Sequence, residues 1–100
     1  IENILLEIVN HPNLDKYFMD DVIVFNEREL VSVNNQILIP DRLVFNSNNE
    51  VTIIDYKTGR SSKSYHQQLI TYEDVLISMN INVIKKLLIY INEEIIVEEI

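Results

Sequence analysis

Two apolar segments flank the polar sequence Asn46-Ser47-Asn48-Asn49, and this arrangement predicts a β-hairpin. The segments cover residues 37–45 and 51–56, and both are rich in the branched aliphatic residues typical of strands. Asp41 and Asp55 nevertheless place one carboxylate in each segment. An unpaired charge inside a strand costs several kcal/mol or is neutralised by a shift of its pKa. The predicted hairpin therefore needs a partner for its two carboxylates.

Apolar spacing predicts further elements on both sides of the hairpin. Before it, we expect helices over residues 1–10 and 13–19 and strands over 22–25 and 29–33, the second strand ending in a turn at Asn34-Asn35. After it, we expect a helix from Ser64 or Tyr65 to Ser78 and strands over 83–91 and 95–97. This order predicts an α/β domain with a mixed central β-sheet flanked by helices. At 100 residues and 47% hydrophobic content, we expect a single domain over residues 1–100.

Composition narrows the classes of function. The chain has no cysteine, which excludes disulfides, zinc–thiolate sites and iron–sulfur clusters and favours an intracellular setting. No apolar run approaches the roughly 20 residues that span a bilayer, so we expect no membrane partner. The net charge of −8 would normally argue against nucleic-acid binding, but four of the eight basic residues lie between positions 42 and 63. Because the chain begins at Ile1, we interpret it as a piece of a longer protein.

Hairpin geometry brings the acidic residues together. Asp41 and Asp55 each lie seven residues from Asn48, so a hairpin centred there sets them opposite one another, with Cβ atoms about 4.5–5.5 Å apart. Such carboxylates repel unless a proton or a cation lies between them. Lys57 follows Asp55 by two residues and shares its face of the strand. Oxygen ligands suit Mg²⁺ or Mn²⁺, so we expect a metal held by Asp41, Asp55 and the backbone carbonyl of Ile54 or Tyr56, and hydrolysis of a phosphodiester.

Four short motifs in order also carry a resemblance to a known family. They are Glu27-Arg28-Glu29-Leu30, Pro40-Asp41-Arg42-Leu43-Val44-Phe45, Ile54-Asp55-Tyr56-Lys57-Thr58-Gly59 and Tyr65-His66-Gln67-Gln68-Leu69-Ile70-Thr71-Tyr72. Over residues 22–91 the chain resembles the PD-(D/E)xK nucleases of the RecB type, above all the C-terminal nuclease domain of UvrD-like and AddA-like helicase–nucleases. The resemblance implies a restriction-endonuclease-like core and a metal-dependent deoxyribonuclease, expected to be an exonuclease. It also implies DNA, helicase domains of the same parent chain and a second nuclease or helicase subunit as partners, and a role in recombination and repair in the bacterial cytoplasm.

The resemblance also assigns residues. It implies that Asp41 and Asp55 are metal ligands, Lys57 is the catalytic lysine and Glu27 is an upstream catalytic acid. It implies that Gln68 and Tyr72 line the DNA-facing side of the site. The polar loop over residues 58–64 offers Arg60 and Lys63 to DNA phosphates. The family usually carries a metal-binding histidine on an N-terminal helix, whereas His11 follows the first predicted helix of this chain.

Three other interpretations of the same residues stay open. The acids could lie at the surface ends of strands, with Arg42 and Lys57 as ordinary ion-pair partners. The domain could be a catalytically inactive DNA-binding or structural module of a helicase assembly, as the missing histidine suggests. It could also be an acidic protein-interaction domain with an incidental metal site.

Overall fold

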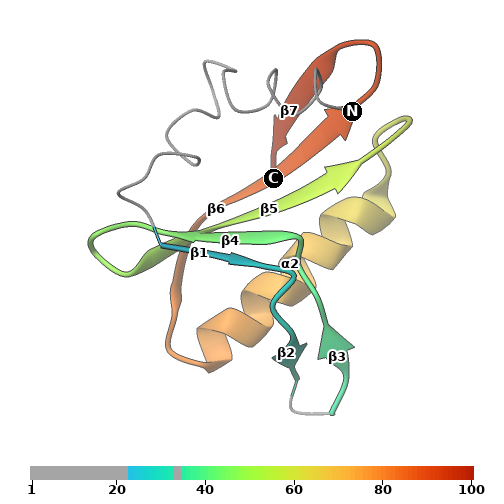
Figure 1. Ribbon diagram of the computed structural model, residues 1–100. Coiled ribbons are helices and arrows are strands. Elements are labelled where there is room, and N and C mark those ends of the chain that lie inside the picture. The colour runs from blue at the N-terminus through green and yellow to red at the C-terminus, as the bar shows by residue number, and fades with distance from the viewer. Residues whose placement is uncertain (1–22, 33–34) are drawn as a thin grey trace.

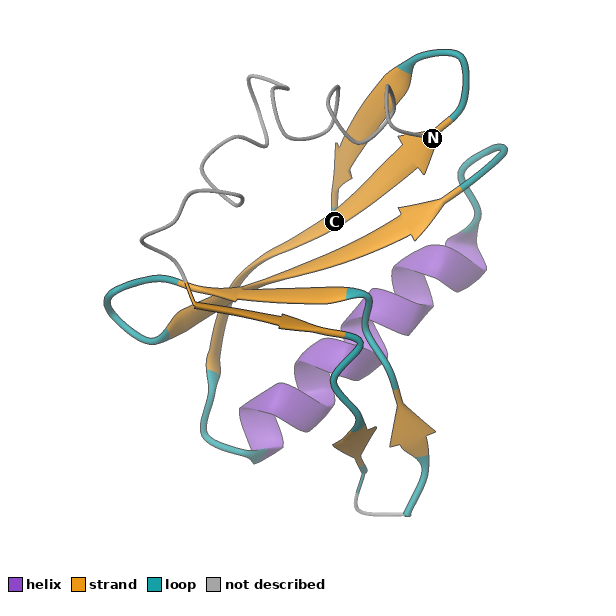
Figure 2. Cartoon of the chain, viewed as in Figure 1, coloured by secondary structure: helices purple, strands orange, loops and turns teal. Residues whose placement is uncertain are grey.

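Five strands form a mixed sheet with one helix lying across one face, as the computed structural model shows for residues 23–32 and 35–100 (Figure 1). The strand order in this sheet is β1-β4-β5-β6-β7. Two further strands, β2 and β3, form a separate small sheet beside the helix (Figure 2). The elements are β1 (Ile23–Asn26), β2 (Leu30–Val31), β3 (Ile37–Leu38), β4 (Arg42–Phe45), β5 (Glu50–Lys57), α2 (Lys63–Ser78), β6 (Asn82–Ile91) and β7 (Ile95–Glu99). The prediction of an α/β domain with a mixed sheet is confirmed.

The β4–β5 hairpin has the predicted register. Arg42 pairs with Ile54 and Phe45 with Val51, so the pairing is symmetric about Asn48. In the turn, the Asn46 Oδ1 atom accepts hydrogen bonds from the backbone N–H groups of Asn48 and Glu50, at 2.9 and 3.0 Å. Asn49 adopts a φ of 59°, which asparagine tolerates better than most residues. Local side-chain chemistry therefore fixes the centre of the hairpin.

Helix α2 connects β5 to β6, which pair in parallel. A parallel pair needs a long crossover, and the helix provides it. The Ser62 hydroxyl caps the helix by accepting a hydrogen bond from the Ser64 N–H at 3.3 Å. Leu69 and Leu76 of the helix are fully buried against Ile53 of β5 and Leu88 of β6. The opposite face of the sheet carries a second apolar cluster, made of Val44, Ile54, Leu87 and Ile89.

The prediction of one continuous strand over residues 37–45 is wrong. The structure divides it into β3, which pairs with β2, and β4, which belongs to the main sheet. The segment Ile39–Asp41 between them is not a strand. Pro40 has no N–H to donate to a sheet and fixes its own φ angle, so the chain leaves the sheet at this residue.

Other predicted boundaries changed less. The strand expected over 29–33 is only Leu30–Val31, and the last strand runs on to Glu99 because Glu98 and Glu99 pair with Leu88 and Leu87 of β6. The helix expected to begin at Ser64 or Tyr65 begins at Lys63 and ends at Ser78 as predicted. The helices predicted over 1–10 and 13–19, and His11 with them, lie outside the described residues. No helix in the described ranges has the length and apolar character needed to cross a membrane.

Candidate active site

The two predicted acids meet at the open end of the β4–β5 hairpin. Asp55 lies on the face of β5 that packs against α2, because residues alternate along a strand and Val51 and Ile53 point to that side. The Asp41 N–H donates to Asp55 Oδ1 at 2.8 Å, and the Tyr56 N–H donates to Asp41 Oδ2 at 2.8 Å. Each carboxylate therefore binds the backbone of the other aspartate's segment through one oxygen. This exchange holds both carboxylates in place without any cation.

Pro40 leaves a third oxygen in the same place. The register that pairs Arg42 with Ile54 would next bring Pro40 opposite Tyr56. In an extended strand, the N–H and C=O of one residue point to the same edge, so the Tyr56 carbonyl shares the edge at which its N–H meets Asp41. A proline in the opposing position cannot donate a hydrogen bond to that carbonyl. Pro40 therefore cannot be the hydrogen-bond donor to the Tyr56 carbonyl.

Burial disfavours the ionised form of the Asp55 carboxyl group. The side chain is 3% exposed, and this burial is the main reason why its pKa rises from 3.8 to about 6. The Asp41 carboxylate raises the pKa further, whereas the hydrogen bond from the Asp41 N–H and the Lys57 ammonium lower it. A divalent cation would remove most of this cost. Two carboxylates and a carbonyl form the all-oxygen set that Mg²⁺ or Mn²⁺ prefers, so the residues present fit such an ion.

Lys57 lies beside the acids and is held by α2. Its Nζ atom donates to Gln68 Oε1 at 2.7 Å and lies 3.7 Å from Asp55 Oδ2. The ammonium also lies 5.0 Å from the centre of the Tyr65 ring, a cation–π distance. The Lys57 side chain is 20% exposed, so it remains accessible to a substrate. The bound lysine thus has a defined direction rather than the freedom of a surface lysine.

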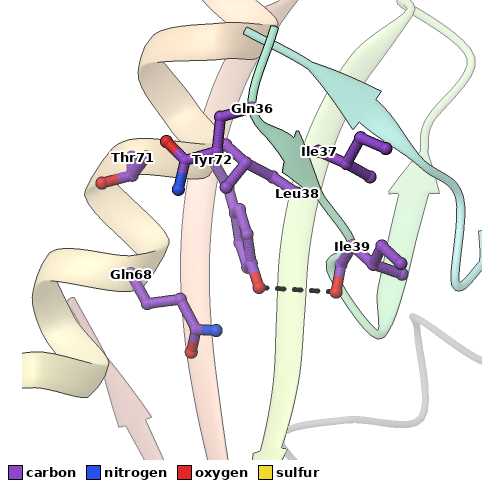
Figure 3. Close-up of a pocket in the computed structure, with 7 residues that line it drawn as sticks. All are labelled: Gln36, Ile37, Leu38, Ile39, Gln68, Thr71 and Tyr72. Carbon is purple, nitrogen blue, oxygen red and sulfur yellow. Dashed lines mark hydrogen bonds between the residues drawn. The ribbon is translucent and has the colours of Figure 1, made fainter.

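Gln68 and Tyr72 connect this lysine to the segment before Asp41. The Tyr72 hydroxyl donates to the Ile39 carbonyl at 3.4 Å, and the Gln68 amide nitrogen points toward that hydroxyl (Figure 3). Burial, together with the Asp55 and Asp41 carboxylates, raises the pKa of Tyr72 to about 12. A hydrogen bond with Gln68 acts in the opposite direction and lowers this pKa. Tyr72 therefore stays a neutral donor, and it is only 3% exposed. Both residues orient other groups of the site, and their contact with DNA stays a prediction.

The remaining predicted residues lie around this centre. Glu27 is exposed, has a φ of 51°, and donates its N–H to the Asp41 carbonyl at 3.0 Å. Its backbone is beside Asp41, yet over residues 23–32 and 35–100 no three His, Cys, Asp or Glu side chains gather to bind a metal. Arg60 and Lys63 are both exposed. Arg60 lies in the loop after β5, and Lys63 is the first residue of α2. The catalytic role of Glu27 and the DNA contacts of the two basic residues stay predictions.

Two residues that hold the loop after Lys57, Asn92 and Glu98, were not predicted from the sequence. The Asn92 side chain binds both backbone groups of Gly59, accepting from its N–H at 2.9 Å and donating to its carbonyl at 3.0 Å. Glu98 accepts hydrogen bonds from Ser61 at 3.2 Å and Tyr90 at 2.9 Å, and its Oε1 lies 2.8 Å from His66 Nε2. An asparagine and a glutamate more than 30 residues away carry no local signal for such a role.

Comparisons with known proteins identify a family and a similar fold. The family model of the PD-(D/E)XK nuclease superfamily matches residues 38–98. Among solved structures, the crystal structure of SSO0001 is similar in fold, with a TM-score of 0.52 and 21% identity. That similarity covers 99% of this chain and 57% of SSO0001, so this chain spans little more than half of that protein's length. No curated protein matches the chain. The fold is a restriction-endonuclease-like α/β core, as expected.

Proposed function

Since the chain belongs to the PD-(D/E)XK nuclease superfamily, we propose that it hydrolyses DNA phosphodiester bonds with a bound Mg²⁺ or Mn²⁺ ion. The observation that carries this proposal is the meeting of Asp41, Asp55 and Lys57 on the α2 side of the β4–β5 hairpin. A buried carboxylate with a raised pKa beside a second acid is typical of a site built to hold a cation.

In this proposal, Asp41, Asp55 and the Tyr56 carbonyl would hold the metal ion, and Glu27 would add an acid at the exposed rim. A bound ion would supply a water of lowered pKa and would polarise a phosphoryl oxygen. The Lys57 ammonium stabilises the negative charge that develops on the phosphate. Gln68 fixes the direction of that ammonium through the 2.7 Å hydrogen bond. Tyr72 holds the Ile39 carbonyl and so supports the segment that carries Asp41.

The wider setting of the proposal is an exonuclease domain of an ATP-dependent helicase–nuclease that acts in DNA recombination and repair. Its partners are DNA, helicase domains of the same parent chain and a second nuclease or helicase subunit. We place that parent protein in the bacterial cytoplasm. A motor that delivers the strand lessens the need for DNA affinity in the nuclease, which accounts for a net charge of −8. Arg60 and Lys63 supply local contacts to DNA phosphates.

The direct test uses labelled linear single- and double-stranded DNA with Mg²⁺, with Mn²⁺ or with EDTA. We expect shortening of the DNA only with a divalent ion, and progressive loss from one end as the mark of an exonuclease. An Asp41→Asn variant, which keeps the size of the side chain, should be inactive under the same conditions. DNA that stays intact with both metals would overturn the proposal.

One observation favours a second candidate, an inactive DNA-binding module. In the described part of the chain, only two acids converge, without a third acid or histidine. This candidate predicts that the protein binds DNA equally well with EDTA or Mg²⁺ and cleaves it in neither case. Binding measured by fluorescence anisotropy in parallel with the cleavage assay separates the two candidates.

Replacing Gln68 tests the positioning of the lysine. Gln68→Ala removes the acceptor that binds Lys57 Nζ and leaves the ammonium to its weaker contact with Asp55 at 3.7 Å. We expect kcat to fall about tenfold while DNA affinity changes little. Removing a charge-stabilising group entirely lowers kcat about 10²- to 10³-fold, and a group that is only misplaced should cost less. Gln67→Ala, an exposed neighbour on the same helix, is the matched control and should keep full activity. A loss of DNA affinity without a change in kcat would instead assign Gln68 to DNA binding.

A further inference from the structure

A pocket of about 420 Å³ opens between β3 and α2, beside Gln68 and Tyr72. Strand β3 and its neighbours form one wall with Gln36, Ile37, Leu38 and Ile39, and helix α2 forms the other with Gln68, Thr71 and Tyr72 (Figure 3). The volume falls within the range typical of small-molecule sites. None of the roles assigned above to the metal ligands or to Lys57 uses this space.

The pocket and the proposed catalytic centre share their boundary. Ile39 lies two residues before Asp41, and its carbonyl accepts the hydrogen bond from Tyr72. Gln68 contacts the pocket on one side and Lys57 Nζ on the other. A phosphate bound beside Lys57 would therefore have its neighbouring nucleoside at the mouth of the pocket.

The lining matches a neutral, flat and polar-edged ligand. None of its seven residues is charged, so a phosphate would find no cation there. The Gln36 amide extends toward Thr71 across the pocket and offers both a donor and an acceptor (Figure 3). The half-buried Leu38 side chain extends from β3 toward Tyr72 and supplies apolar surface to the pocket (Figure 3). Nucleobases combine apolar faces with edges that carry donors and acceptors, and glutamine can read such an edge.

The position of the basic residues gives the strand a direction across the site. Lys63 begins α2, and Thr71 lies eight residues farther along it, or about 12 Å at 1.5 Å per residue. The charged end of the helix suits the sugar–phosphate backbone, and the uncharged pocket suits a base. Lys57 contacts Gln68, which lies between these two positions along the helix.

We propose that this pocket receives one unstacked nucleobase of the substrate, on the nucleotide next to the cleaved phosphate. The inference rests on the proposed nuclease function and adds to it a substrate class, DNA single strands or frayed ends. A base within a duplex is paired and stacked and cannot enter without being extruded. Leu38 contacts the face of the base, and the Gln36 amide contacts its edge.

The experiment moves a single abasic residue along a short single-stranded oligonucleotide. Binding is measured by fluorescence anisotropy with Ca²⁺, and cleavage is measured with Mg²⁺. For the wild-type chain, we expect the abasic residue to weaken binding about tenfold at one position and little elsewhere, as loss of one protein–base contact does. In the cleavage assay with Mg²⁺, the position at which the abasic residue weakens binding should lie next to the cleaved phosphodiester bond.

A variant that fills the pocket completes the test. Thr71→Phe places a ring in the pocket and gives up only the hydroxyl's hydrogen bond to the Gln67 carbonyl of its own helix. It should bind intact DNA about tenfold more weakly and lose the position-specific effect. Ile77→Phe introduces the same ring at a 54% exposed position of α2 outside the pocket and should match the wild type. If Thr71→Phe does not fold, Gln36→Ala should still reduce the position-specific effect about threefold.

The outcomes separate this inference from the proposed function. Cleavage of DNA with no position-specific effect would overturn the pocket and leave the nuclease function standing. A position-specific effect on binding without any cleavage would support the pocket and count against the nuclease. A duplex that binds and is cut as well as the single strand would also overturn the inference, because its bases are not free to enter.

Discussion

Replacing Lys57 with alanine is expected to reduce metal-dependent DNA hydrolysis about 100- to 1,000-fold, the usual cost of losing one preorganised charge-stabilising group. The ammonium is fixed by Gln68 at 2.7 Å and lies 3.7 Å from Asp55, so it acts from a defined position. The rate is measured as kcat/KM on labelled DNA at saturating Mg²⁺.

The control for this prediction is Lys85→Ala, which removes a lysine of β6 that pairs with Glu99 at 3.9 Å, away from the carboxylates. This variant should retain the wild-type rate. Both variants should keep the wild-type circular dichroism spectrum, because neither lysine belongs to an apolar cluster. A Lys57→Ala protein that keeps more than about a tenth of the activity would show that the lysine has no catalytic role.

Replacing Asp55 with asparagine is expected to stabilise the metal-free protein at pH 8 by as much as about 3 kcal/mol. This value follows from a folded-state pKa of about 6 against an ordinary 3.8, at 1.36 kcal/mol for each pH unit. Burial is the main cause of the raised pKa, so the ionised carboxylate is what the fold tolerates poorly. The asparagine can still accept the hydrogen bond from the Asp41 N–H through its carbonyl oxygen.

The sign of the pH dependence follows from the same values. Below about pH 3.8 Asp55 is protonated in both the folded and the unfolded chain, and its full contribution to stability is present. Between about pH 3.8 and pH 6 the unfolded chain ionises first, so this contribution is lost as the pH rises through 6. The decline should be visible in urea titrations of the wild type in EDTA and should be absent from Asp55→Asn.

Two comparisons complete this prediction. Asp74→Asn, at an exposed position of α2, should retain the wild-type decline, because Asp74 is not buried. Added Mg²⁺ should stabilise the wild type at pH 8 and leave Asp55→Asn unchanged, since a ligand stabilises only a fold that binds it. Equal pH profiles for the wild type and Asp55→Asn would mean that burial of Asp55 carries no such cost.

Several features of the site were predictable because they depend on short-range rules. The polar sequence from Asn46 to Asn49 set the centre of the hairpin, and symmetry about Asn48 then brought Asp41 opposite Asp55. The alternation of side chains along a strand put Lys57 on the face of Asp55. The apolar spacing after Ser64 predicted α2 to within two residues of its observed start. In each case the signal lies within a few residues of the feature.

Other features depend on contacts between distant segments and had no such signal. The structure alone separated β3 from β4 at Pro40, placed Gln68 against Lys57, and tied Asn92 to Gly59. These contacts depend on how α2 and the β6–β7 hairpin pack on the sheet.

The sequence by itself determined which chemical groups are present and which of them share a strand face: two carboxylates and a lysine on a hairpin, followed by a helix with Gln68 and Tyr72. Only the tertiary structure decided how those groups are used. It gave each carboxylate a backbone N–H of the opposing segment, buried Asp55 enough to raise its pKa, and enclosed a pocket between β3 and α2. The physical reason is that burial and hydrogen-bond geometry depend on the packing of segments far apart in the chain, whereas strand and helix periodicity depends on neighbouring residues.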